Sequence, residues 1–413
     1  MKGFTSRHGK CERKVSKWLW PYNPTSYNTS SAVLGVKVYL DNAATTPLAP
    51  EVLEAMLPYL NEKFGNASSL HEWGREAREA IENARATIAQ KLNCEVSEII
   101  FTSGGTEANN MAIKGIAFAN RDKGNHIITQ KTEHPCVLNA CKWLEQRGFE
   151  VTYLNVDEHG MIRLEDLEAA MRKDTILVSI MHANNEIGTV QPIKEIARIC
   201  NERGVYFHTD ACQSFTKEAL DVKRFELDLV TINAHKIHGP KGVGALVVRE
   251  GTRIDPLLHG GGHEFGLRSG TENVAGIVGF GKAVEIAKPE HVLHMRKLRD
   301  LLIKRVLNEI ERVKLNGHPN KRLCNNANFT FYDVDGESLV LRLDARGIAT
   351  STSSACASHK PEPSHVLLAI GLKPEEARSS LRLTLSRYNT KEEIEYAIEV
   401  LKEEVANLRR IAK

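Results

Sequence analysis

Two patterns of apolar positions occur along most of this chain: helical spacing in some segments and short, mostly apolar runs in others. Segments 51–64 and 74–92 carry apolar residues at three- and four-residue spacing, which predicts amphipathic helices. Short runs rich in β-branched and other apolar residues predict strands that start near residues 98, 126, 150, 175, 205 and 228. A helix-like or turn-rich stretch separates each of the last four runs from the next. This alternation is typical of a parallel α/β sheet.

Polar residues stand at the ends of several of these predicted strands. They are Ser103–Thr106, His134, Asn184–Asn185, Asp210 and His235–Lys236. In open α/β sheets, ligands bind at the carboxyl ends of the strands. The sequence therefore predicts one crowded polar site along this edge of the sheet.

The pattern changes in the last third of the chain. A long charged helix is predicted over residues 290–313, followed by strand-like runs at 325–332 and 380–386. A chain of 413 residues exceeds the usual limit for a single core. We therefore expect an N-terminal extension over residues 1–37, a large domain over 51–291, and a small α+β domain formed by 38–50 and 292–413.

The composition is that of an ordinary globular protein, with 42% apolar and 26% charged residues. No run approaches the roughly 18 apolar residues that suggest a membrane span, so no membrane partner is expected. Residues 1–30 carry six basic side chains and one acidic side chain, a net of +5, whereas the whole chain is at +3. The rest of the chain is therefore at −2, and this slightly acidic body gives no sign of a nucleic-acid partner.

The first 37 residues are basic and rich in Ser and Thr. This composition overlaps with that of organellar transit peptides, but no clear amphipathic helix or cleavage signal accompanies it. We expect a disordered extension, with organellar targeting as the open alternative.

Eight cysteines are scattered through the chain, and none forms a CxxC pair. Their spacing predicts neither a zinc site nor a disulfide framework, and no metal is expected. Scattered cysteines fit a reducing compartment, so the cytoplasm is the expected location.

Two charged residues at predicted strand ends are candidates for chemistry. Lys236 lies in a turn with Gly and Pro, where lysine is usually a solvated charge, although a desolvated lysine can form Schiff bases. Asp210 follows a strand too apolar for a sheet edge, so its carboxylate needs a cation or a donor. A structural salt bridge would serve, and so would a protonated pyridine nitrogen, which pyridoxal phosphate (PLP) requires to act as an electron sink.

Segment 101–115 combines a strand, a Gly-containing turn and a helix start. The backbone N–H groups of Gly105 and Thr106 would point outward at the helix N-terminus, where an anion is favoured. The alternative is an ordinary capping box with Thr106 at the N-cap and an acidic residue nearby. The residues of this segment alone leave both interpretations open.

Nine short motifs, taken together, resemble the NifS/IscS-type cysteine desulfurases, which are class V PLP enzymes of the aspartate-aminotransferase fold. The motifs occur in order from Val38 onward, and they are DNAATTP, SGGTEANN, TEHPCVLNA, HANNEIGTVQP, HTDACQS, AHKIHGPKG, GGGHEFGLRSGTEN, SSACAS and LRLTLSRYNT. The resemblance implies an α/β protein of PLP fold type I. A mostly parallel seven-stranded sheet is expected in the large domain, beside the smaller α+β domain.

The resemblance also implies roles for individual residues. Lys236 is similar to the lysine that binds PLP and removes the Cα proton, and Asp210 to the partner of the pyridinium nitrogen. His134 resembles the histidine that stacks on the PLP ring and can shuttle protons. The remaining contacts are Gln213 with the phenolic oxygen, Asn185 with cofactor and substrate, Gly105, Thr106, Asn233 and His235 with the phosphate, Thr271 with the phosphate of the neighbouring subunit, and Arg382 with the substrate carboxylate. The contact of Thr271 implies a homodimer. Relatives commonly carry serine at the position of Asn233, whose amide can still donate to phosphate.

Cys356 lies in STSSACASHK, a run of small hydroxylated residues without apolar periodicity. The resemblance implies that its thiolate takes the sulfur of L-cysteine as a persulfide and leaves L-alanine. The sulfur then passes to an acceptor, expected to be an iron–sulfur scaffold or another sulfur-carrying protein. A flexible loop would let one thiol visit both cofactor and acceptor. The cysteines of the neighbouring motifs, Cys136, Cys141, Cys212 and Cys324, are expected to pack in the interior or to have little freedom to swing.

Two alternatives stay open at this point. The same fold could serve a selenocysteine lyase or another PLP-dependent lyase or aminotransferase, and a transaminase would not need Cys356. The chain could instead be a non-catalytic sulfur-binding scaffold. Such a scaffold is expected to have lost Lys236, Asp210 or Cys356, and all three are present.

Overall fold

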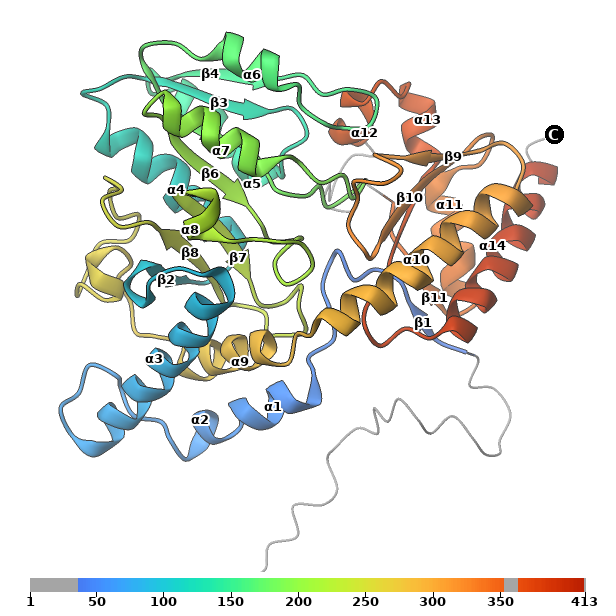
Figure 1. The fold of residues 1–413 in the computed structure, drawn as a ribbon. Helices are drawn as coiled ribbons and strands as arrows, with labels where there is room; N and C mark the ends of the chain where they lie inside the picture. The colour runs from blue at the N-terminus through green and yellow to red at the C-terminus, as the bar shows by residue number, and fades with distance from the viewer. Residues whose placement is uncertain (1–35, 353–362, 412–413) are drawn as a thin grey trace, which may run out of the picture. The chain divides into compact units, whose positions relative to one another are not determined.

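The computed structural model describes residues 36–352 and 363–411 (Figure 1). Residues Val36–Lys413 form one compact unit. A seven-stranded sheet and a three-stranded sheet with separate hydrophobic cores organise the described residues of this unit, and two short strands form a third sheet. Residues 1–35 of the predicted extension lie outside the described residues, and so does Cys356. The boundaries proposed for the large and small domains stay a prediction.

The larger sheet has seven strands in the order β2-β8-β7-β6-β5-β3-β4. The strands from β7 to β4 run parallel, whereas β8 pairs antiparallel with both β2 and β7. The expected α/β class with a mostly parallel seven-stranded sheet is confirmed. The strands span Ile99–Thr102 (β2), His126–Gln130 (β3), Glu150–Leu154 (β4), Thr175–Ser179 (β5), Tyr206–Asp210 (β6), Leu229–Asn233 (β7) and Gly244–Val248 (β8).

Helices cover both faces of this sheet, as a largely parallel sheet requires (Figure 1). Neighbouring residues of β7 point into different cores: Val230 joins one with Phe280, and Leu229 joins the other with Ile113. The first core is closed by α1, α3, α7 and α9, and the second by α4 and α5. The helices span Pro50–Met56 (α1), Pro58–Asn61 (α2), Glu72–Leu92 (α3), Gly105–Ala119 (α4), Pro135–Glu145 (α5), Leu164–Ala170 (α6), Ile193–Glu202 (α7), Val222–Phe225 (α8) and Val274–Glu285 (α9), with 3-10 turns at Val96–Glu98 (η1) and Glu264–Gly266 (η2).

The smaller sheet has three antiparallel strands in the order β12-β10-β9. Its core takes Leu302, Leu339 and Leu401 from three helices, α10, α11 and α14. Val38 and Leu40 join the same core because β1 pairs in parallel with β11. These elements span Val38–Tyr39 (β1), Pro289–Glu309 (α10), Val313–Asn316 (β9), Asn326–Phe331 (β10), Gly336–Ala345 (α11), Ile348–Ala349 (β11), His365–Ala369 (α12), Pro374–Arg378 (α13), Ser380–Thr384 (β12) and Lys391–Ile411 (α14).

Three local expectations differ from the structure. The helix expected over 51–64 is divided into α1 and α2 around Pro58, because proline lacks the N–H that would continue the helical ladder. The helix expected over 290–313 ends at Glu309. Val313, the last residue of the expected helix, is instead the first residue of β9. Strand β8 was not expected, because it is short and directly follows a turn rich in Gly and Pro. In the described residues, no helix is both long and apolar enough to cross a membrane.

Candidate active site

A cavity of about 540 Å³ lies at the carboxyl ends of β6 and β7 and at the N-terminus of α4. Ten of the twelve predicted site residues line it, namely Gly105, Thr106, His134, Asn185, Asp210, Gln213, Asn233, His235, Lys236 and Arg382. Thr271 is exposed between η2 and α9 and does not line this cavity. Cys356 lies outside the described residues. The expected single polar site therefore exists in the folded chain.

Asp210 is the last residue of β6, and its carboxylate is buried. One oxygen accepts from the side-chain amide of Asn109 at 2.7 Å, and the other accepts from the backbone N–H of Cys212 at 2.9 Å. Within residues 36–352 and 363–411, no cationic side chain forms an ion pair with it. The structural salt bridge considered from the sequence is therefore not found in this part of the chain. A buried carboxylate without a cation suits a protonated ring nitrogen.

The N-terminus of α4 borders the same cavity and has free backbone N–H groups. Gly104 is its N-cap, with φ at +150°, and no side chain caps the helix. The capping box with Thr106 at the N-cap is therefore wrong, because the N-cap lies two residues earlier, at Gly104. A Cβ on Gly105 would lie 2.6 Å from Sγ of Cys212, so only glycine fits there. This end of the cavity suits an anion such as phosphate.

Lys236 follows β7 in the turn that closes the cavity. Its Nζ donates to the carbonyl oxygens of Ala43 and Ala44, the latter at 2.7 Å. A second ammonium lies close by: Lys217 Nζ donates to the carbonyl oxygens of Gln213 at 3.0 Å and Lys236 at 3.2 Å. Burial, with the positive charges nearby, lowers the pKa of Lys236 to about 8. A useful fraction of this amine is therefore neutral near physiological pH.

His134 is the N-cap of α5, and its geometry determines which ring nitrogen carries the proton. Nδ1 accepts from the backbone N–H of Cys136 at 3.2 Å and lies 3.0 Å from the Cys136 thiol. Burial lowers the pKa of His134, so the ring is neutral. The proton of the neutral ring is therefore assigned to Nε2. Cys136 does more than pack, which corrects the expectation from sequence, because it lines the cavity and contacts His134.

His235 and Gln213 join the cavity to the N-terminal segment 41–46. Nδ1 of His235 lies 3.2 Å from the hydroxyl of Thr45, and its carbonyl accepts from the hydroxyl of Thr46 at 2.8 Å. Gln213 Nε2 donates to the carbonyl of Ala43 at 3.0 Å. Burial, with Lys236 nearby, lowers the pKa of His235 to about 4, so this histidine is neutral.

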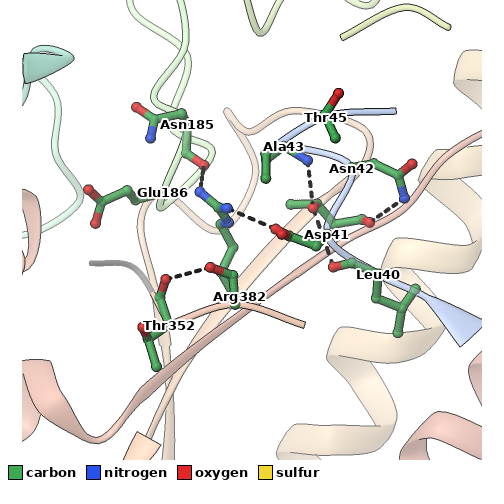
Figure 2. Close-up of polar contacts among 12 residues, drawn as sticks. Leu40, Asp41, Asn42, Ala43, Thr45, Asn185, Glu186, Thr352 and Arg382 are labelled. Carbon is green, nitrogen blue, oxygen red and sulfur yellow. Dashed lines mark hydrogen bonds and ion pairs between the residues drawn. The ribbon is translucent and has the colours of Figure 1, made fainter. Parts of the chain in front are cut away.

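Arg382 comes from β12 and reaches the cavity from the smaller sheet (Figure 2). One terminal nitrogen donates to the carbonyl of Asn185 at 3.0 Å, and the other pairs with Asp41 at 2.9 Å. Nε is buried and has no partner in the part of the chain that the structure describes. The guanidinium is thus held in place with donor capacity to spare.

Several residues of this site were not singled out from the sequence. Glu186 is buried in the cavity wall, where burial raises its pKa to about 7, and the hydroxyl of Ser364 donates to it. His365 also lines the cavity and its Nε2 lies 2.9 Å from the carbonyl of Glu133. Asn109 sits four residues after Gly105, one helical turn along α4, which is the one signal that could have placed it beside Asp210.

Burial distinguishes the cysteines of the described residues that do not line the cavity, and Cys212, which does. Cys141, Cys200, Cys212 and Cys324 are buried and Cys94 is partly buried, and burial raises the pKa of each thiol. Such thiols carry little thiolate near neutral pH and are poor nucleophiles. Cys212 and Cys324 are therefore interior residues, as expected. No cluster of three potential metal ligands exists in the described residues.

Comparison with known proteins places this arrangement in a family context. Residues 38–397 match the aminotransferase class-V family. A protein named cysteine desulfurase IscS from Dictyoglomus turgidum is 55% identical over 379 residues, which is 91% of this chain and 96% of that protein. A protein of the same name from Methanosarcina thermophila is also 55% identical and covers 91% of this chain and 93% of its own length.

Solved structures give the same picture. One titled NifS-like protein superposes with a TM-score of 0.85 at 40% identity and covers 90% of this chain and all of its own. Another, titled SspA in complex with cysteine, superposes with a TM-score of 0.78 at 41% identity and covers 86% of this chain and all of its own. Sequence and fold therefore point to the same group of proteins.

Proposed function

Because this chain belongs to the aminotransferase class-V family, as a PLP-dependent cysteine desulfurase, we propose that it converts L-cysteine to L-alanine and carries the sulfur on Cys356. The predicted family, fold, enzyme class and cofactor are confirmed by the family match and the relatives. The roles of single residues are proposals. One observation carries them: ten predicted residues, spread from Gly105 to Arg382, line one cavity.

The cavity has the groups needed to hold PLP. The buried carboxylate of Asp210 suits the ring nitrogen, and the glycine turn before α4 suits the phosphate. Asn233 also lines the cavity, and its buried side-chain oxygen has no partner in the described residues. The residues proposed to hold the cofactor are Gly105, Thr106, His134, Asn185, Asp210, Gln213, Asn233, His235 and Lys236, with Thr271 contributed by the partner subunit.

When bound, PLP supplies a carbonyl for the substrate amine and a ring that withdraws electrons from the substrate Cα. Lys236 is proposed to accept the Cα proton. An amine with a pKa of about 8 is deprotonated in roughly one molecule in ten at pH 7. It can therefore work as a base without a partner carboxylate. His134 holds its proton at Nε2 and is proposed to return a proton to the reacting molecule.

Arg382 is proposed to hold the substrate carboxylate. Its planar guanidinium can bind a carboxylate through two N–H groups at once, which fixes the substrate in orientation as well as position. Asn185 is proposed to assist, and its carbonyl already fixes one end of the guanidinium at 3.0 Å. These contacts suit the carboxylate of any α-amino acid, and L-cysteine is the expected substrate because of the relatives named cysteine desulfurase and the one solved in complex with cysteine.

The sulfur step is proposed to occur on Cys356. Its thiolate attacks the substrate sulfur, the bond between that sulfur and the substrate Cβ breaks, and the electron pair of that bond stays with the carbon. The carbon gains a proton and leaves as part of alanine, while the sulfur remains as a persulfide on Cys356. The buried cysteines of the cavity wall are poor alternatives, because burial raises the pKa of Cys136 to about 12.

Absorbance and product assays on the purified protein test this function. With PLP added, the wild-type protein is expected to show a visible band that L-cysteine shifts, and to release alanine. The Lys236→Ala variant is expected to form no alanine, because it lacks the proposed base. Full activity in this variant would refute the role of Lys236. A visible band with no alanine from cysteine would favour a different amino-acid substrate.

Removal of the proposed nucleophile tests the sulfur step separately. Cys356→Ser is expected to keep the visible band and its shift with L-cysteine, but to release almost no sulfide. Cys94→Ser is the matched control, because Cys94 lies near η1 and does not line the cavity. Normal sulfide release by Cys356→Ser would show that another group accepts the sulfur.

A homodimer is proposed for the working enzyme. Large apolar side chains are exposed on one part of the surface, from α2 to the start of α3 and on η2: Leu60, Phe64, Leu70, Trp73 and Phe265. Leu70 is 91% exposed, which is unusual for a leucine on a monomer surface. A hollow of about 310 Å³ joins Ser68 and Phe265 to Glu272, next to Thr271. A second copy would cover this surface and bring Thr271 to the partner site.

Light scattering with two variants tests the dimer. Leu70→Asp is expected to give monomers with weak PLP binding, because a charge disrupts the apolar contact. Thr271→Val is expected to leave the dimer intact and still weaken PLP binding. A monomeric wild-type protein with full activity would refute the proposal.

The final acceptor is proposed to be a protein with an accessible thiol, such as an iron–sulfur scaffold, in the cytoplasm. The acceptor follows from the chemistry of a persulfide, whose terminal sulfur moves to a thiolate by exchange. With radiolabelled cysteine, label is expected on Cys356 first and then on an added scaffold protein. Label that never leaves the enzyme would refute transfer to that acceptor.

A further inference from the structure

Segment 41–46, the start of the DNAATTP motif, contacts several proposed site residues, although its own residues have no role so far. Carbonyls of Ala43 and Ala44 accept from Lys236, and the carbonyl of Ala43 also accepts from Gln213. Asp41 differs from the rest of the segment, because it carries a charge and directs it at Arg382. Figure 2 shows the contact between the Asp41 carboxylate and the Arg382 guanidinium.

The position of Asp41 is fixed by its backbone. The Asp41 carbonyl accepts from the hydroxyl of Tyr39 at 3.1 Å and from the N–H of Ala44 at 3.0 Å, and Asp41 bridges to Thr384 on β12. Its side chain is 20% exposed and that of Arg382 is 6% exposed. Asp41 does not line the cavity, whereas Arg382 does. The carboxylate therefore contacts the guanidinium from beside the cavity and not from within it.

Arg382 is held at two points and not saturated. The carboxylate takes one N–H of one terminal nitrogen, the carbonyl of Asn185 takes one N–H of the other, and Nε has no partner in the described residues. Five donors exist on a guanidinium, so three have no partner in the described residues, and the two on the terminal nitrogens remain for a second carboxylate. That second carboxylate and the Asp41 carboxylate would then bind the same guanidinium, and two negative charges that close together repel each other.

We propose that Asp41 is a positioning residue that holds Arg382 in place and weakens its grip on the substrate carboxylate. This rests on the proposed role of Arg382 as the carboxylate-binding group. Substrate and product carry the same carboxylate, so the contact with Arg382 contributes equally to the binding of both, and a stronger contact slows the release of L-alanine. Partial neutralisation by Asp41 lets the product leave. Asp41 acts through the arginine and does not touch the reacting atoms.

Equilibrium binding of a matched pair of ligands to the holoenzyme tests this proposal. L-Alanine and L-alaninamide have the same amine, and only L-alanine has a carboxylate. Asp41→Asn keeps an oxygen that can accept from Arg382 and removes the charge. It is expected to bind L-alanine about three- to tenfold more tightly, as loss of a partly screened repulsion predicts. The affinity for L-alaninamide is expected to stay within about twofold, because L-alaninamide has no carboxylate for Arg382 to bind.

Two further variants separate positioning from charge. Asp41→Ala is expected to bind L-alanine less tightly than Asp41→Asn, because one end of Arg382 then has no acceptor. Calorimetry and the cofactor absorbance both report binding without turnover, and the unfolding midpoint of each variant checks the fold. If Asp41→Asn binds L-alanine as weakly as the wild-type protein, or more weakly, the proposal is overturned.

Arg382→Gln shows which assignment has failed. If it weakens L-alanine binding while Asp41→Asn changes nothing, Arg382 binds the carboxylate and only the role of Asp41 is wrong. If Arg382→Gln leaves L-alanine binding unchanged, the proposed function of Arg382 is itself wrong, and the inference about Asp41 fails with it.

Discussion

Two arginine–carboxylate pairs of this chain have the same chemistry and different surroundings. Arg85 of α3 pairs with Glu264 of η2 through both terminal nitrogens at 2.8 Å, and the two side chains are 3% and 4% exposed. Arg382 and Asp41 make a single contact at 2.9 Å beside the cavity. Both side chains of the first pair are almost fully buried, although they lie in the wall of the hollow near Thr271, and we call it the sealed pair. The second pair borders the cavity of the proposed site.

The difference lies in what remains unsatisfied. Nε of Arg85 pairs with Glu82, one terminal nitrogen also donates to the carbonyl of Ile99, and Glu264 accepts from the N–H of Phe101 as well. Arg382 has an unpartnered Nε in the described residues. A saturated pair stabilises the fold around it, whereas leftover donors next to a cavity indicate a binding group. The sealed pair also anchors η2, which precedes Thr271 in the chain.

The largest effect is expected where the sealed pair is broken. Arg85→Met leaves Glu264 buried without its cation, and loss of one partner of a buried pair costs about 3–5 kcal/mol. The urea midpoint for unfolding is expected to fall strongly, and circular dichroism measures it. The double variant Arg85→Met with Glu264→Gln is the control and is expected to recover part of the loss. A wild-type midpoint in the single variant would show that the pair does not stabilise the fold.

A substitution in the pair of Arg382 and Asp41 is expected to have a large effect on catalysis and a small effect on stability. Arg382→Gln removes the proposed carboxylate contact, which at about 2–4 kcal/mol lowers kcat/KM for L-cysteine by roughly 30- to 1000-fold. Asp41 is partly exposed and can be hydrated once Arg382 is gone, so the urea midpoint is expected to change little. Arg387→Gln is the matched control, because Arg387 donates to the carbonyl of Ile286 and does not line the cavity. An equal loss of kcat/KM in Arg382→Gln and Arg387→Gln would show that the effect does not depend on contact with the cavity.

A third cation, Lys217, differs from Arg85 and Arg382 because it forms no ion pair with a carboxylate in the described residues. Its charge lies beside Lys236 and contributes to lowering the pKa of Lys236. Lys217→Met removes a positive charge, so protonation of Lys236 becomes easier and its pKa rises. The neutral amine then forms only at higher pH, and the rate at pH 7 is expected to fall about two- to fivefold.

Rebinding of PLP to the apo-protein as a function of pH measures this shift independently of turnover. The profile of Lys217→Met is expected to move to higher pH than that of the wild-type protein. Lys217→Arg keeps the charge and is expected to stay closer to the wild-type profile. Coincident profiles for all three proteins would mean that Lys217 does not influence Lys236.

The smallest effect is expected at a fully solvated pair. Arg198 and Glu202 on α7 lie 2.5 Å apart, and their side chains are about 60% exposed. Exposed pairs contribute little, because water and salt screen them. Arg198→Gln is expected to leave both the urea midpoint and kcat/KM unchanged within error. A clear loss of stability would show that exposure is a poor guide to which pairs matter in this chain.

The sequence by itself determined the class of fold and most members of the site. Helical spacing of apolar residues predicted the amphipathic helices, and short runs rich in β-branched and other apolar residues predicted the strands. Polar residues at the strand ends then predicted the site, because the carboxyl ends of parallel strands meet at one edge. Asp210 and Lys236 were found in this way, and the motifs added the rest, including Arg382 from the other sheet.

The tertiary structure alone decided what these residues contact. Asp41 and Arg382 are 341 positions apart, and no local pattern predicts that β1 and β12 bring them to 2.9 Å. The same holds for the second ammonium beside Lys236, and for the thiol of Cys136, which was expected only to pack and instead contacts His134. The pattern of apolar residues within a helix or strand predicts which of its side chains are buried, because burial depends on the face of that element on which a side chain lies. Charge, protonation and hydrogen bonding depend on neighbours from distant elements, so only the folded chain fixes them.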